Sequence, residues 1–327
     1  MDFAKQLELP ELPKYLSRVD QKLAQVMRSE SPVIDRALKH LLKTNGKRLR
    51  PTLVMATAVA GGAKVNQQLV NAAAALELVH LGSLVHDDII DRAKTRRRSA
   101  TINALEGKDQ AIVVGDYLFA KAFEVANSAS PEIGSLVAAT ITDLCVGESI
   151  ELADQHNTAR SIDSYLLAIS KKTAVLIAAS CTVGGLCAKL SAAQLKKIAG
   201  YGQNFGTAFQ IIDDLLDLLS TEEQLGKPAG GDLRAGVYTL PLLLALAGLD
   251  KSHAKELIKT KNPDELLDLI NKNGYLQQTA IVAKKYNDQA ADSLKGFSPA
   301  FKSLAVLPKT YFEWSHKLCT NNGYLIS

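Results

Sequence analysis

Apolar residues along the chain recur at helical spacing, and no run alternates convincingly between apolar and polar positions as a half-buried strand would. Segments of about 15 to 28 residues lie between helix-start signals and glycine-rich breaks. The start signals are four pairs of a capping residue with proline and one capping box, at Ser31-Pro32, Ser130-Pro131, Asn262-Pro263, Ser298-Pro299 and Ser191 to Gln194. Because no low-complexity linker divides these segments, they predict one all-α domain over residues 1–327, built from ten or more helices.

Two predicted helices, about Val70–Ile90 and about Ala199–Leu219, are apolar nearly all round. Such a helix normally lies at the centre of a protein, surrounded by other helices. Both end on the same pattern, Asp-Asp-x-x-Asp, so the chain carries this motif twice. The six residues of the two motifs are Asp87, Asp88, Asp91, Asp213, Asp214 and Asp217.

The aspartate spacing predicts a cation site. Residues four apart share one face of a helix, so Asp87 stacks on Asp91 while Asp88 points about 100° aside. These carboxylates repel one another, and the helix dipole disfavours anions at a C-terminal end. Carboxylate oxygens suit Mg²⁺, which often bridges to phosphates. A single motif would more simply be a solvated acidic helix end, whereas two copies favour metal motifs that hold a Mg²⁺-diphosphate.

Basic residues near the first motif offer partners for phosphate. Arg96 and Arg97 follow it, and guanidinium groups can bind phosphate oxygens through two hydrogen bonds. Lys47 and Arg50 lie one turn apart in GKRLRP, and His80 lies about two turns before the motif. Taken alone, His80 also fits a core histidine, and the first two cations also fit a basic surface turn. Since no glycine-rich phosphate loop is present, side chains and metal would have to bind the phosphates.

Composition narrows the class of protein further. The net charge of +4 is too small for a broad nucleic-acid-binding patch, so no nucleic-acid partner is expected. Four cysteines without a Cys-x-x-Cys pair indicate a reducing compartment, and the N-terminus lacks the pattern of a signal peptide. The longest apolar run, Thr173–Ala188, has 16 residues, fewer than the roughly 18 to 20 that span a bilayer. We therefore expect a cytoplasmic protein with no transmembrane segment.

Six stretches between about Gly46 and Leu244 resemble, in order and spacing, the motifs of the trans-type (head-to-tail) polyprenyl diphosphate synthases. They are GKRLRP, ELVHLGSLVHDDIID with RR following, GDYLFAKAF, KKTAVL, GTAFQIIDDLLD and GKPAGGDLRAGVYTLP. The resemblance implies an isoprenoid synthase fold with helices around a central cavity, usually a homodimer, and three Mg²⁺ ions. It implies that isopentenyl diphosphate is condensed with an allylic diphosphate by ionisation, condensation and elimination.

The resemblance also implies roles for individual residues. The six aspartates would hold the metals, with Asp87, Asp91 and Asp213 as direct ligands. The allylic diphosphate would be bound by Arg96, Lys172 and Lys227. Isopentenyl diphosphate would be bound by Lys47, Arg50, His80 and Arg97. Catalysis would involve Lys172, together with Thr173 and Gln210, whose oxygen dipoles would lie near the developing carbocation.

Product length is expected to depend on the residues before the first motif. Ser83 and Gly82, four and five positions before Asp87, are small. Aromatic side chains there stop chain growth early in the family, so an all-trans product of C20 or longer is expected, with C30 to C40 preferred. Phe119 and Phe123 are candidates for a deeper tunnel floor, although core packing explains both equally well.

The sequence departs from the family pattern in two places. Arg98, Ser99 and Ala100 stand where Gly-x-Pro is usual before Thr101, so this loop is expected to be ordered differently. Val237 replaces a lysine that is common before the TLP motif, which weakens the expected binding of the allylic diphosphate.

Several alternatives remain open at this point. A geranylgeranyl diphosphate synthase, or the catalytic subunit of a two-component heptaprenyl diphosphate synthase with a small partner subunit, would carry the same motifs. A class I terpene cyclase shares the first motif but usually has a different second one. Finally, Glu77-x-x-His80 and Glu313-x-x-His316 have the ligand spacing of a di-iron carboxylate bundle, although that site leaves both aspartate motifs unexplained.

Overall fold

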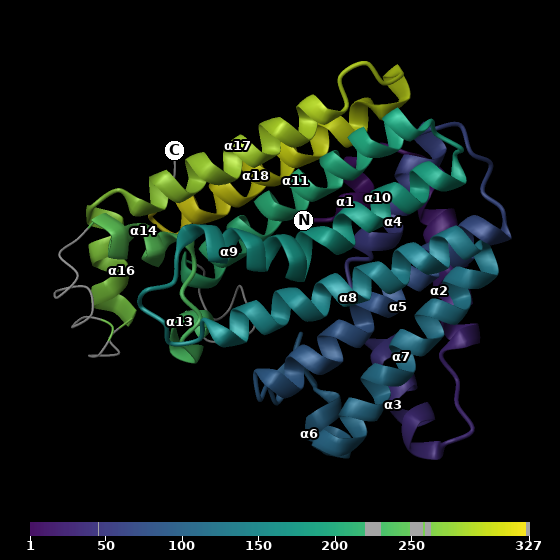
Figure 1. Ribbon diagram of the computed structural model, residues 1–327, viewed down its shortest axis with the longest axis horizontal. Helices are drawn as coiled ribbons and strands as arrows, with labels where there is room; N and C mark the ends of the chain where they lie inside the picture. Colours follow the sequence, from purple (N-terminus) through teal and green to yellow (C-terminus); the bar gives the residue numbers. More distant parts are fainter. Residues whose placement is uncertain (45, 220–229, 249–257, 259–262, 325–327) are drawn as a thin grey trace.

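The described part of the chain folds into packed helices and one very short hairpin (Figure 1). The computed structural model describes residues 1–44, 46–219, 230–248, 258 and 263–324. The elements in chain order are α1 (Phe3–Gln6), α2 (Leu12–Val26), α3 (Pro32–Lys43), α4 (Leu49–Ala60), α5 (Gln67–Ile90), β1 (Thr95–Arg96), β2 (Ser99–Ala100), α6 (Ile102–Glu106), α7 (Lys108–Ala129), α8 (Pro131–Ala153), α9 (Ile162–Ile169), η1 (Ser170–Ala174), α10 (Val175–Cys187), α11 (Ala192–Leu219), α13 (Gly231–Ala235), α14 (Leu240–Gly248), α16 (Pro263–Lys272), α17 (Tyr275–Ser293), η2 (Pro299–Phe301) and α18 (Lys302–Asn321). The predicted all-α class is confirmed. The short antiparallel pair β1–β2 was not predicted.

The capping signals in the sequence account for several helix starts. The Ser130 hydroxyl accepts a hydrogen bond from the backbone N–H of Ile133 at 3.1 Å, at the start of α8. Ser191 and Gln194 form the predicted capping box before α11, each side chain accepting from the other residue's backbone N–H. Ser298-Pro299 begins the 3₁₀ turn η2, which leads into α18. Local signals of this kind therefore set where the chain enters its helices.

The two apolar helices predicted to be central are α5 and α11. α5 packs against α2, α4, α7 and α10, and α11 packs against α10, α17 and η1. In Figure 1, α17 and α18 run side by side along one edge of the molecule, and α5 and α7 lie toward the opposite side. Because their flanks are covered by neighbouring helices, α5 and α11 hold the two aspartate motifs in fixed positions at their ends.

Three described helices are long and apolar enough to cross a membrane, judged by length and composition alone. They are Gln67–Ile90, Pro131–Ala153 and Ile162–Cys187, and the buried shares of their apolar windows are 72%, 33% and 50%. The sequence-based expectation that no segment has this length is thus not confirmed. The expectation was based only on runs without charged residues, whereas the helix Ile162–Cys187 continues through Lys171 and Lys172. α5 is mostly covered by its own chain, but α8 leaves most of its apolar window uncovered.

Candidate active site

The first motif lies at the C-terminal end of α5. Asp87 is half-buried, and Asp91, the residue that ends the helix, is exposed. Burial raises the pKa of Asp87 to about 7, with nearby Lys172 opposing the rise and Glu148 adding to it. Burial and the nearby carboxylates therefore disfavour the charged form of Asp87.

Lys172 of η1 lies near this motif, where its charge acts on Asp87. Its ammonium group contacts the carboxylates of Glu148 at 2.7 Å and Glu151 at 2.5 Å, both on α8. Burial opposes the charged form, but the surrounding carboxylates, Glu151 first and then Asp87, raise the pKa of Lys172. The position of Lys172 depends on the close packing of α8 against η1. A Cβ added at Gly147 of α8 would lie only 2.3 Å from the Lys172 backbone nitrogen. Only glycine lets the two backbones approach this closely.

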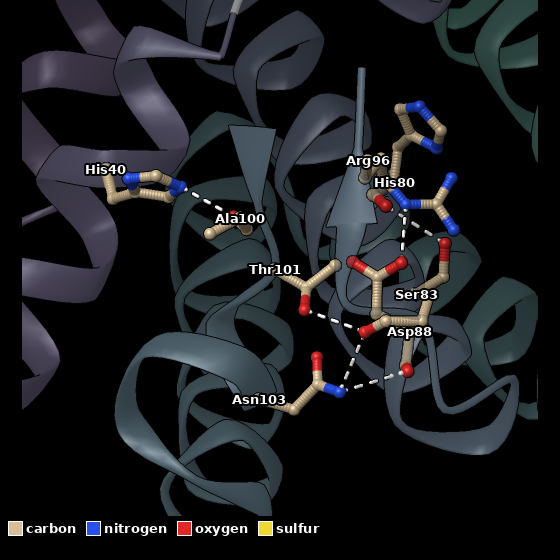
Figure 2. Close-up of polar contacts among 9 residues, drawn as sticks. His40, His80, Ser83, Asp88, Arg96, Ala100, Thr101 and Asn103 are labelled. Carbon is tan, nitrogen blue, oxygen red and sulfur yellow. Dashed lines mark hydrogen bonds and ion pairs between the residues drawn. The ribbon is translucent and has the colours of Figure 1, made fainter. Parts of the chain in front are cut away.

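The hairpin after α5 carries the arginines that follow the first motif. Asp88 is 5% exposed and accepts a hydrogen bond from Arg96 Nε at 2.7 Å (Figure 2). Arg97 and Arg98 form the two-residue turn, with φ of +52° and +63°. Positive φ at both central residues is the conformation that matches the twist of a tight hairpin. The departure from the usual Gly-x-Pro therefore coincides with a left-handed turn made of two arginines.

Polar contacts fix both ends of the hairpin to its surroundings (Figure 2). The Thr101 hydroxyl donates to the Ala93 carbonyl at 2.8 Å, and Asn103 Nδ2 donates to the same carbonyl at 3.0 Å. His40 Nε2 of α3 lies 2.8 Å from the Ala100 carbonyl oxygen. The backbone that carries the arginines is thus anchored from three directions, although its turn residues are exposed.

A second group of cations gathers beside the hairpin. Arg50 Nη1 lies 3.4 Å from His80 Nε2, and burial followed by the charges of Arg50 and Arg97 holds the pKa of His80 well below its usual value. The imidazole is therefore neutral, and its ring nitrogen can accept from the guanidinium. Arg97 packs over Gly46, where an added Cβ would lie 2.8 Å from Arg97 Nη1. By contrast, the Lys47 ammonium lies 5.8 Å from the centre of the Trp314 ring of α18.

The second motif ends α11 and has unequal members. Asp213 is exposed, whereas Asp214 and Asp217 are 5% and 6% exposed. Asp214 accepts from the Tyr165 hydroxyl at 2.6 Å and from Gln210 Nε2 at 2.7 Å. Burial raises the pKa of Asp214 to about 7, and these two hydrogen bonds oppose the rise. One Asp217 carboxylate oxygen accepts from the backbone N–H of Asp232, so it anchors the segment that begins α13.

The predicted pair Thr173 and Gln210 lies in contact beside this motif. The Thr173 hydroxyl donates to Gln210 Oε1 at 2.7 Å. Thr173 belongs to η1, a π-helical turn that joins α9 and α10 into one continuous helix. Two oxygen atoms from separate helices are thus brought together beside Asp214, which accepts from the Gln210 amide.

Comparison with known proteins identifies the family. The family model described as Polyprenyl synthetase matches residues 31–272, about three quarters of the chain. The chain belongs to this family. This polyprenyl synthetase is 35% identical over 298 residues to heptaprenyl diphosphate synthase component 2 of Bacillus subtilis, covering 89% of this chain and 85% of the relative. It is 32% identical to geranylgeranyl diphosphate synthase of Saccharolobus solfataricus, covering 86% and 89%.

Solved structures of the family share the fold. Decaprenyl diphosphate synthase from Rhodobacter capsulatus matches with a TM-score of 0.85 and 29% identity, over 97% of this chain and 99% of that chain. Geranylgeranyl pyrophosphate synthetase from Pyrococcus horikoshii matches with a TM-score of 0.86 and 31% identity, over 96% and 99%. The predicted family, isoprenoid synthase fold and prenyltransferase activity are confirmed.

The structure of the synthase also shows what sequence reasoning missed. Glu77, offered by the di-iron alternative as a ligand, is 2% exposed and pairs with Arg48 at 2.8 Å. Glu148 and Glu151 belong to none of the motifs that pointed to the site, yet both form ion pairs with Lys172. Tyr165 carried no motif that pointed to Asp214. Lys227, assigned to the allylic diphosphate, lies outside the described residues.

The residues proposed to limit product length have different environments. A Cβ at buried Gly82 would lie 3.0 Å from the Phe119 ring, so Phe119 faces α5 at that position. Ser83 is half-buried, and its hydroxyl donates to the His80 carbonyl at 2.9 Å (Figure 2). Phe123 is 47% exposed on α7, so it can form a tunnel floor only where another chain covers it.

Metal binding by this synthase would depend on more than protein side chains. Among the described residues, no three His, Cys, Asp or Glu side chains are grouped closely enough to hold a metal by themselves. Mg²⁺ usually takes one or two carboxylates and completes its shell with waters and substrate phosphates. Hard carboxylate oxygens at the ends of α5 and α11, with Asp87 near the charges of Glu148 and Asp91, fit that mode of binding.

Proposed function

We propose that this synthase condenses isopentenyl diphosphate head-to-tail with an allylic diphosphate to give an all-trans polyprenyl diphosphate. The supporting observation is the convergence of two carboxylate motifs and two groups of cations at the ends of α5 and α11. A diphosphate carries several negative charges, so a site with the cations Lys172 and Arg96 near Asp87, and Arg50 near Arg97, suits two such substrates when Mg²⁺ bridges the carboxylates to phosphate.

In this proposal Asp87, Asp91 and Asp213 hold Mg²⁺, of which the family resemblance implies three ions. Bound Mg²⁺ would neutralise the charge on the departing diphosphate. The chain itself orients the substrates: Arg96 and Lys172 hold the allylic diphosphate, and Lys227 would join them.

Isopentenyl diphosphate is assigned to Arg50, Arg97, Lys47 and neutral His80. When the allylic C–O bond ionises, the cation lies near the oxygens of Thr173 and Gln210, whose dipoles stabilise it. The isopentenyl double bond then attacks, a C–C bond forms, and a proton leaves to the released diphosphate. Apolar helix faces exclude water, which would otherwise quench the cation.

We propose a product of C20 or longer, with C30 to C40 preferred, because Gly82 and Ser83 place no large side chain before the first motif. The alternative within the family is geranylgeranyl diphosphate. Both product classes occur among the names of the relatives, so the names alone do not decide between them.

We also propose that a second copy covers the outer face of α7 and α8. Ile112, Val113 and Phe123 of α7 and Val146 and Leu152 of α8 are 40% to 47% exposed, an unusual set of large apolar side chains for a surface. A homodimer would bury them and would cover Phe123. The expected mass in light scattering is twice the 35.2 kDa of one chain, and Val113→Glu should shift it toward one chain. A monomer that gains activity on addition of a small second protein would instead favour a two-component synthase.

A cytoplasmic location is proposed from the four free cysteines.

The reaction is tested with purified protein, Mg²⁺, farnesyl diphosphate and radiolabelled isopentenyl diphosphate. Labelled diphosphates longer than C15 together with pyrophosphate support the proposal, and chromatography of the dephosphorylated products gives their length. Labelled hydrocarbon would indicate a cyclase. Absence of turnover that is restored by a partner subunit would indicate the catalytic half of a two-component enzyme.

A further inference from the structure

The middle aspartate of each motif has a different environment from its neighbours. Asp88 and Asp214 are both 5% exposed, whereas Asp91 and Asp213 are exposed and Asp87 is half-buried. A buried carboxylate is costly unless hydrogen-bond donors satisfy its oxygens. Arg96 donates to Asp88, and Gln210 and Tyr165 donate to Asp214. The proposed reaction uses Arg96 and Gln210.

Asp88 holds the base of the arginine hairpin. Its carboxylate accepts from Arg96 Nε at 2.7 Å, and its carbonyl oxygen accepts from the Ala93 N–H at 2.9 Å and from Asn103 Nδ2 at 3.3 Å (Figure 2). A guanidinium that donates through Nε keeps both terminal nitrogens for another acceptor. The ion pair thus aims the end of Arg96 outward, where a phosphate can accept two hydrogen bonds.

Asp214 has the equivalent position in the second motif. It accepts from Gln210 Nε2 at 2.7 Å, one helical turn earlier, and from the Tyr165 hydroxyl at 2.6 Å. Because the amide nitrogen of Gln210 faces Asp214, the amide oxygen must face the other way. That oxygen accepts from Thr173, which leaves the lone pairs of the threonine hydroxyl for a cation.

We propose that Asp88 and Asp214 are positioning residues: Asp88 orients Arg96 toward the allylic diphosphate, and Asp214, fixed by Tyr165, sets the direction of the Gln210 amide. The metals are left to Asp87, Asp91 and Asp213. The inference rests on the proposed function for the identity of the substrates, but the hydrogen bonds that carry it do not depend on that identity.

The first test counts bound metal and needs no turnover. Mn²⁺ is titrated into each protein with inorganic pyrophosphate, and unbound Mn²⁺ is measured by electron paramagnetic resonance. Asp88→Asn and Asp214→Asn should bind as many Mn²⁺ ions as the wild type, with affinity within about threefold. The matched controls Asp87→Asn and Asp213→Asn should each lose at least one ion. Loss of an ion in either middle-aspartate variant overturns the proposal.

The second test separates KM from kcat. Asp88→Asn should raise KM for farnesyl diphosphate at least tenfold with kcat within threefold, because a neutral amide oxygen holds the Arg96 guanidinium more weakly than the carboxylate does. Asp214→Asn should lower kcat at least tenfold with KM within threefold, because asparagine can donate to Gln210 and turn its amide around. Tyr165→Phe, which removes one donor to Asp214, should lower kcat by a smaller factor.

Double variants show whether each aspartate acts through its named partner. In an Arg96→Ala background, Asp88→Asn should change KM by less than twofold, and in a Gln210→Ala background Asp214→Asn should change kcat by less than twofold. Should Asp214→Asn fail to fold, Tyr165→Phe in the same background gives the equivalent measurement. Fully additive effects would overturn the positioning roles. Wild-type protein that binds Mn²⁺-pyrophosphate but elongates no prenyl chain would instead refute the proposed function and leave the metal count valid.

Discussion

Replacing Arg48 with methionine would leave Glu77 as a buried carboxylate without its ionic partner. Glu77 is 2% exposed, and its Oε1 lies 2.8 Å from Arg48 Nη1, while Arg48 also contacts exposed Asp20 at 2.8 Å. Breaking a buried pair by removing one partner costs about 3 to 5 kcal/mol. Losing the Asp20 contact through Asp20→Asn should cost only about 0 to 1 kcal/mol, because that carboxylate is half in water.

The structure also predicts how the loss can be repaired. Glu77→Gln keeps a neutral acceptor, and Arg48 keeps Asp20, so this variant should lose about 1 to 3 kcal/mol. Arg48→Met combined with Glu77→Leu removes both charges and should recover most of the loss. The measurement is urea unfolding followed by circular dichroism at pH 7, comparing midpoints at constant m-value.

The order of the four variants tests the reasoning. A loss below about 1 kcal/mol for Arg48→Met, or a double variant no more stable than that single one, would show that burial of the pair has been misjudged. The pair also matters to the site, because the negative charge of Glu77 lies among the cations Arg50 and Arg97. It acts as a fixed counter-charge that lets several guanidinium groups gather before any substrate arrives.

Three further predictions concern the site and its surroundings. Ser83→Phe places a ring about 6 Å along α5 from Asp87 and should shorten the product by at least one C5 unit, seen by chromatography; an unchanged product ladder would refute the tunnel direction. The folded-state pKa of His80 lies below its unfolded value of about 6.5, so stability should fall as pH drops below that value, and His80→Gln should remove this part of the loss in urea midpoints between pH 7.5 and 5. Arg98→Gly should stabilise the turn at φ +63° by up to about 1 kcal/mol and Arg98→Val should destabilise it, and equal urea midpoints for both would contradict the left-handed assignment.

Sequence reasoning located the two central helices and the aspartates at their ends because hydrophobic periodicity and the Asp-Asp-x-x-Asp spacing are local patterns. It placed their ends at Ile90 and Leu219, where α5 and α11 do end. It brought Thr173 and Gln210 together only through the family resemblance, and the hydrogen bond between them agrees with that.

Other features depend on contacts between distant parts of the chain. The Tyr165–Asp214 bond joins residues 49 apart, and nothing in either segment encodes it locally. The Lys47 ammonium lies 5.8 Å from the centre of the Trp314 ring of the last described helix, a neighbour that the GKRLRP stretch does not indicate. The left-handed turn at Arg97 contradicts the usual preference for glycine or asparagine, which is why its geometry was not foreseen.

The π-helical turn η1 has a consequence for the length of the chain. Tyr165 and Thr173 are eight residues apart on one continuous helix, which in a regular α-helix would separate them by about 80° around the axis. A π turn accommodates about one extra residue, so the directions of the two side chains around the helix axis instead differ by about 20°. Both side chains therefore form hydrogen bonds with α11. The helix therefore contains one residue more than a regular α-helix would need to point Tyr165 and Thr173 in nearly the same direction. Deleting Ser170 should convert η1 to a regular turn and keep both side chains on α11, whereas deleting two residues would swing Thr173 about 100° away from Gln210.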